Sequence, residues 1–84
     1  MTERTPAEVF PPSDYIKEEM AERGWSASAL AEGMDCSLRL AEEIINGRKV
    51  TLMIAQMLSN AFGTGAMFWV NLQNYYDKYK PLKE

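Results

Sequence analysis

The feature that most constrains this chain is a repeated pairing of a glycine with a nearby serine or threonine. Gly24 is followed by Ser26 and Gly47 by Thr51, and Gly63 closes another segment of the same kind. Glycine adopts the left-handed conformation that ends many helices, and serine or threonine side chains cap the first turn of a helix. The sequence therefore predicts a series of short helices joined by tight turns.

Apolar spacing supports five such helices and no strand. We expect them at about 13–23, 27–34, 38–46 and 51–62, with a fifth that starts at Thr64 or Gly65 and ends before Pro81. Ser13 or Asp14 is the expected cap of the first. Apolar residues three or four apart predict one buried stripe on each helix. Expected core residues are Ile16, Met20, Leu30, Ala31, Met34, Ala41, Ile44, Ile45, Ala55, Leu58, Phe62, Phe68 and Trp69.

The predicted fold is all-α and forms a single domain. Residues 1–12 read as an extended N-terminal arm, 13–79 as a helix-turn-helix domain with a C-terminal helix, and 80–84 as a tail. The second and third helices have the lengths and separation of a helix-turn-helix, whose second helix can lie in the DNA major groove. Asp35, Cys36 and Ser37 form the turn, since Asp tolerates the left-handed conformation. Sequence-specific DNA binding is the first hypothesis.

Size and composition limit the possible assembly, chemistry and location of the protein. A chain of 84 residues is marginally stable alone, which favours a homodimer. With one cysteine and no histidine, we expect no internal disulfide, no metal site, no cofactor and no catalytic residue. The N-terminus lacks the apolar segment of a signal peptide, so a cytoplasmic location is expected. Residues 50–70 carry no charge, yet polar and glycine residues interrupt them, so no membrane span is predicted.

The charge balance argues against generic binding to nucleic acid. The net charge is −3, and residues 26–49 carry three basic and four acidic side chains. Non-specific binders are usually basic. Any DNA binding must therefore depend on a few well-placed groups.

Several sequence blocks resemble the XRE-type helix-turn-helix family and, within it, the HigA-type antitoxins. The resemblance covers about residues 12–78. It rests on Glu-Arg-Gly-Trp-Ser at 22–26, Ile-Ile-Asn-Gly-Arg-Lys-Val-Thr at 44–51, and Phe-Trp-Val-Asn-Leu-Gln at 68–73. It implies a lambda-repressor-like domain that represses its own operon as a dimer on a palindromic operator. It also implies a partner toxin, typically an endonuclease of messenger RNA, and no small-molecule substrate.

Three departures from the family weaken the hypothesis of DNA binding. The family often has Gln where this chain has Ala27, and a turn glycine where it has Asp35. Adjacent acids also stand on the expected recognition helix. The alternative is therefore a protein-interaction module on the same scaffold, and a solo repressor of phage or plasmid origin lies between the two.

The candidate DNA contacts lie on the second and third helices and in the segment after them. Arg39 suits the acceptor edge of guanine, and a Glu can accept from cytosine; the alternative for Arg39 is a solvated pair with Glu42 or Glu43. Arg48 and Lys49 suit phosphates or are ordinary surface charges. The full set of candidates is Ser26, Ser28, Ser37, Leu38, Arg39, Glu42, Glu43, Arg48 and Lys49.

The uncharged fourth helix is a candidate contact either with a protein partner or with the second copy of a homodimer. Its expected outer face carries Met53, Gln56, Met57 and Asn60, and methionines on such a face suit an adaptable interface. The alternative is an unoccupied surface. Cys36 is expected to be a small buried residue. Asn71 and Gln73 have no role that the sequence assigns.

Overall fold

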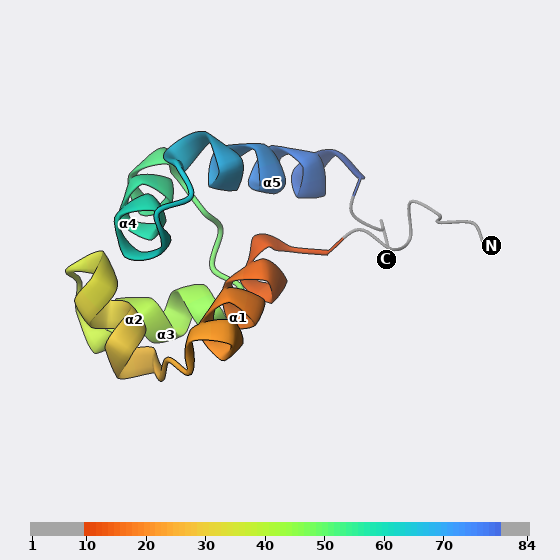
Figure 1. Cartoon of the computed structure of the whole chain (residues 1–84). Coiled ribbons are helices and arrows are strands. Elements are labelled where there is room, and N and C mark those ends of the chain that lie inside the picture. The colour runs from red at the N-terminus through yellow and green to blue at the C-terminus, as the bar shows by residue number, and fades with distance from the viewer. Residues whose placement is uncertain (1–9, 80–84) are drawn as a thin grey trace.

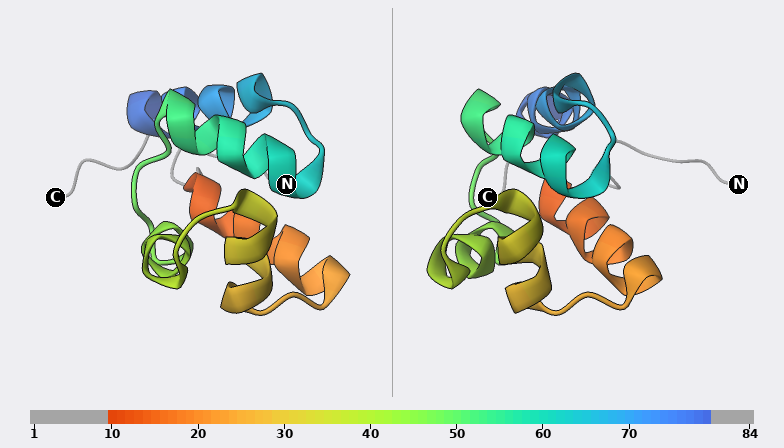
Figure 2. Two further views of the ribbon diagram at one scale, coloured as in Figure 1. Left: turned by 90° about the vertical axis from the view of Figure 1, so that its left-hand side faces the viewer. Right: turned by 60° about the vertical axis from the view of Figure 1, so that its left-hand side comes forward.

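Residues 10–79 of the computed structural model form five helices and no strand, as expected (Figure 1). They are α1 (Pro12–Arg23), α2 (Ala27–Met34), α3 (Leu38–Ile45), α4 (Leu52–Phe62) and α5 (Ala66–Tyr79). Both views in Figure 2 place α4 and α5 together on one side and α1, α2 and α3 on the other. Contacts between α2 and α4, and between α1 and α5, join the two groups. The structure describes residues 10–79.

The predicted caps explain where most helices begin. The hydroxyl of Ser26 accepts from the amide of Ala29 at 3.2 Å, and that of Ser37 accepts from Leu40 at 3.1 Å. Thr51 caps α4 in the same way. Each side chain satisfies one amide that the helix itself leaves without a partner.

The predicted stops also hold. Gly24 and Gly63 end α1 and α4 with φ of 68° and 74°, and Asp35 ends α2 with φ of 58°. Asp35 thus stands where the family has a turn glycine, and its backbone adopts the left-handed conformation that glycine would take there.

The predicted cap of α1 was wrong, although the helix begins within one residue of the expected position. Its cap is Pro11, which makes no side-chain hydrogen bond, and Pro12 takes the first helical position. Proline is suited to that position because an amide there would have no partner within the helix. Ser13 is instead a buried residue of the first turn. Most of the expected arm, residues 1–9, and the expected tail, residues 80–84, lie outside the described part of the chain.

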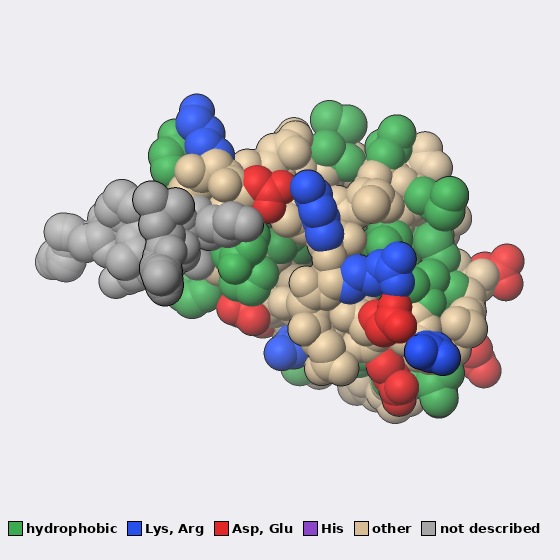
Figure 3. Space-filling model, turned by 180° about the vertical axis from the view of Figure 1, so that it is seen from behind, with side chains coloured by type: hydrophobic (Ala, Val, Ile, Leu, Met, Phe, Trp, Pro, Cys, Tyr) green, Lys and Arg blue, Asp and Glu red, His purple; other side chains and the backbone are tan. Residues whose placement is uncertain are grey.

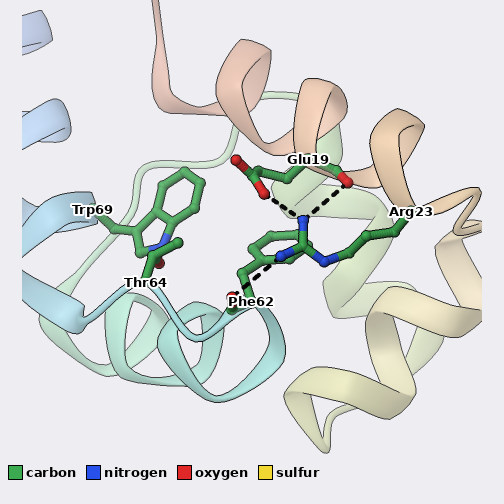
Figure 4. Close-up of polar contacts among 5 residues, drawn as sticks. All are labelled: Glu19, Arg23, Phe62, Thr64 and Trp69. Atoms are coloured by element: carbon green, nitrogen blue, oxygen red, sulfur yellow. Dashed lines mark hydrogen bonds and ion pairs between the residues drawn. The ribbon is translucent and has the colours of Figure 1, made fainter.

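The core gathers most of the residues that the apolar spacing predicted. Trp69 is fully buried, and its indole N–H donates to the Thr64 hydroxyl at 2.7 Å (Figure 4). The ring of Phe62 stacks on Trp25 at 5.3 Å and lies 5.9 Å from Trp69. This aromatic group fixes the α4–α5 hairpin against the turn between α1 and α2.

The guanidinium of Arg23 packs against the same aromatic group. Arg23 lies 4.9 Å above the ring of Phe62 and donates to its carbonyl oxygen at 3.3 Å (Figure 4). The same guanidinium pairs with Glu19 one turn earlier. The end of α1 is thereby joined to the end of α4.

Three residues expected in the core lie nearer the surface. Phe68 is 42% exposed, because Trp69 takes the inward direction of α5 and a neighbour in sequence points about 100° away. Ile45 and Cys36 are only half-buried, at the last turn of α3 and in the loop before it. No helix within residues 10–79 is long and apolar enough to cross a membrane.

Candidate nucleic-acid interface

The helix-turn-helix presents a largely polar outer face that also includes the exposed Leu38. Ala41 and Ile44 of α3 are fully buried, so they fix which side of that helix faces outward. We call the outward group the recognition face. It consists of Ser37, Leu38, Arg39, Glu42, Glu43, Arg48 and Lys49, of which only Glu43 is half-buried.

The serines at the starts of α2 and α3 can still donate a hydrogen bond while they cap these helices. Ser26 and Ser37 accept hydrogen bonds from backbone amides within the first turns of α2 and α3. Each hydroxyl therefore retains its own O–H to donate, which suits a phosphate oxygen. Ser28 is exposed in the first turn of α2. These groups lie at helix N-termini, where the backbone dipole favours an anion.

The basic side chains of the recognition face are already paired with acids. Arg39 is 89% exposed, and its Nε lies 3.5 Å from Glu43. The same carboxylate pairs with Arg48. The paired alternative for Arg39 is thus realised with Glu43. Because exposed pairs contribute little free energy, a phosphate or base can displace them.

Basic and acidic side chains consequently alternate over this side of the molecule (Figure 3). A surface of this kind attracts DNA weakly as a whole. It favours a site that supplies specific partners for its few cations over any stretch of phosphates.

Lys49 forms an ion pair with Asp77 of α5, a residue to which the sequence analysis gave no role. Its ammonium lies 3.4 Å from the carboxylate of Asp77 on α5. Asp77 in turn accepts from the Gln73 amide at 2.9 Å, and the Gln73 oxygen accepts from the Val50 backbone N–H at 2.8 Å. Two residues of α5 therefore hold two successive residues of the segment between α3 and α4.

The burial of Gln73 gives it the role that the sequence left open. It is only 6% exposed, on the side of α5 that also buries Trp69 four residues earlier. That spacing is the signal that a sequence reading could have used. A polar residue at a core position of a helix needs a hydrogen-bond partner, which here is the backbone of Val50.

The surroundings of Cys36 disfavour the reactive thiolate form of its side chain. Partial burial raises the pKa of its thiol, with the neighbouring Asp35 carboxylate acting in the same direction and a backbone hydrogen bond from Ala41 opposing it. The thiol donates to the carbonyl oxygen of Ser37 at 3.4 Å. A raised pKa keeps the thiol protonated at neutral pH, and the thiol is a poor nucleophile. Within residues 10–79, no group of acids and cysteine could hold a metal ion.

A second surface, with Lys78 as its one exposed charge, covers the outer faces of α4 and α5. On α4, Met53 is 71% exposed, and Gln56 and Asn60 are exposed beside it. Met57 was expected with them, but it is half-buried and packs against the core, because it lies toward the edge of that face. On α5, the large exposed side chains are Met67, Phe68, Tyr75 and Tyr79.

Comparison with known proteins agrees with this architecture. The chain is 34% identical over 77 residues to antitoxin HigA-1 of Vibrio cholerae serotype O1, spanning 90% of this chain and 70% of the relative. The structure of the Pseudomonas aeruginosa antitoxin HigA with the higBA promoter superposes with a TM-score of 0.78 at 29% identity. That match covers 84% of this chain and 79% of the other. No family model matches the chain.

Proposed function

Because the chain belongs to the HigA antitoxin family, we propose that it is a DNA-binding antitoxin that represses its own promoter and neutralises a toxin. The observation that carries the proposal is the capped α2–turn–α3 unit, set in a fold that superposes on a HigA structure with promoter DNA. The function is regulatory binding, and it takes place in the cytoplasm.

In this proposal, α3 lies in the major groove and Arg39 is its principal base contact. Arg39 carries the only guanidinium on that helix, and its side chain extends into solvent. A guanidinium can donate two hydrogen bonds to the O6 and N7 of guanine. Glu42 is exposed one turn later and can accept from a cytosine amino group. Ser26, Ser28, Arg48 and Lys49 hold the flanking phosphates.

The acting form is a homodimer whose contact we place on the outer face of α5. Phe68, Leu72, Tyr75 and Tyr79 follow one another at spacings of four, three and four, which gives a single seam along the helix. Lys78 is the only charged residue on the exposed side of α5. A two-fold axis pairs such a seam with its own copy. Two recognition helices then address half-sites about one DNA turn apart.

The outer face of α4 is left for the toxin. Met53 extends there beside Gln56 and Asn60, and a flexible thioether adapts to a partner surface. The half-buried Met57 contributes only at the edge of this contact. The DNA and toxin surfaces thus lie on different helices.

The test compares the chain's own promoter with a random duplex of equal length, by competition binding over a range of salt concentrations. We expect promoter affinity to exceed random affinity by on the order of a thousandfold or more. Equal, weak binding to both duplexes would favour the alternative, a protein-interaction module. The pairing of every basic residue of the recognition face with an acid is the observation that keeps this alternative in view.

A further inference from the structure

The link between α5 and the segment after α3 has a consequence for DNA affinity. Lys49 is 69% exposed, so its ammonium can reach a phosphate, yet it lies beside the Asp77 carboxylate. Asp77 belongs to a helix that contributes no other group to the recognition face. Its carboxylate is therefore a counter-charge brought to the face from elsewhere in the fold.

The position of this counter-charge is fixed by a part-buried hydrogen bond from Gln73, whose own bond to Val50 is buried. Gln73 donates to one carboxylate oxygen of Asp77 at 2.9 Å, and the other oxygen faces Lys49 at 3.4 Å. Gln73 is itself held by the amide of Val50, which is 4% exposed. The carboxylate cannot swing away without giving up the Gln73 bond, so it stays beside Lys49 more firmly than a free surface acid would.

We propose that Asp77 competes with DNA phosphate for Lys49 and so lowers the affinity of the protein for all DNA sequences alike. This inference rests on the proposed function, since it assumes that Lys49 meets the DNA backbone. A phosphate that binds Lys49 must replace the carboxylate or tolerate its negative charge nearby. Phosphates are present in every sequence, so the penalty is uniform. Promoter selectivity then depends on α3 alone.

Asp77→Asn is the direct test, because it removes the charge and keeps an oxygen that can accept from Gln73. Affinity is measured for the promoter and for a random duplex at low salt. We expect both to tighten by about two- to fivefold, the effect of one exposed ion pair. The slope of log affinity against log salt should steepen by up to about one, as for one added phosphate contact. Asp77→Ser serves as a second variant if the first melts well below wild type.

Two controls assign the effect to Lys49. In a Lys49→Ala background, Asp77→Asn should change affinity much less than in wild type. The ammonium for which the Asp77 carboxylate and the DNA phosphate compete is then absent. Glu22→Gln removes the same charge from an exposed residue of α1 that forms no ion pair within residues 10–79, and it should leave affinity unchanged.

Unchanged or weaker binding by Asp77→Asn would overturn the inference, as would an equal gain in the Lys49→Ala background. A different result would contradict the proposed function. If wild type binds promoter and random duplex equally, the specificity claim is lost, whereas a Lys49-dependent gain on both duplexes would still uphold the competition.

Discussion

The recognition face and the outer surface of α4 and α5 differ in almost every physical respect. Residues 38–49 carry five charged side chains, and residues 50–70 carry none. The cations of the first surface are paired with acids, whereas the second leaves Met53 71% and Met67 59% exposed to water.

The difference indicates which partner each surface fits. An exposed ion pair can exchange its carboxylate for a phosphate at little net cost, so the recognition face suits reversible binding to DNA. Exposed apolar side chains gain free energy only when another apolar surface covers them. The α4–α5 surface therefore suits protein partners.

The largest predicted effect breaks the dimer and leaves the DNA surface intact. Phe68→Glu/Tyr75→Glu places two charges in the proposed α5 seam, where loss of buried aromatic anchors costs about 2 kcal/mol or more. Sedimentation should show the dimer dissociation constant raised by about thirtyfold or more. Helical circular dichroism should persist, because both side chains are exposed.

Met53→Glu is the matched control for this pair. It adds a charge to the outer face of α4, so the dimer should remain while toxin binding weakens. If Phe68→Glu/Tyr75→Glu stays dimeric, or if Met53→Glu loses the dimer, the dimer contact lies on α4 and not on α5.

The next effect separates two kinds of contact within the recognition face. Arg39→Ala should lose about 1–3 kcal/mol on the promoter and relax selectivity at one base pair. Lys49→Ala should weaken promoter and random duplexes alike and reduce the salt slope by about one. Binding to a panel of single-base promoter variants measures both. Uniform weakening by Arg39→Ala would assign it to a phosphate.

The smallest effect tests the boundary between the core and the outer surface of α4. Met57→Gln should lower the free energy of unfolding by about 1 kcal/mol, since Met57 packs against the core. Met53→Gln should change it by less than about 0.5 kcal/mol, as is usual for an exposed position. Thermal or urea unfolding of the two variants gives the comparison, and equal losses would mean that the two methionines are equally buried.

The helices were predictable from sequence because their limits depend on local chemistry. Ser26, Ser37 and Thr51 cap through their own side chains, and Gly24 and Gly63 stop helices through their own backbone. The cap of α1 was predicted wrongly because a proline at the first turn competes with a serine cap, and spacing alone does not choose between them.

The candidate site was only partly predictable. The exposed positions of α3 follow from helical periodicity, and the pairing of Arg39 with Glu43 follows from their separation of four. The network of Gln73, Asp77, Lys49 and Val50 depends on how α5 packs against the segment after α3. No local pattern encodes that packing. The half-buried position of Met57 was missed for the same reason.

Hydrogen exchange of the protein with and without its promoter duplex shows which surface the DNA covers. We expect slowed exchange at the starts of α2 and α3 and along residues 46–49, at salt concentrations where a random duplex gives none. Exchange along the outer face of α5 should be the same with and without DNA. Protection by DNA on α4 and α5, with none on α3, would contradict the assignment of the two surfaces.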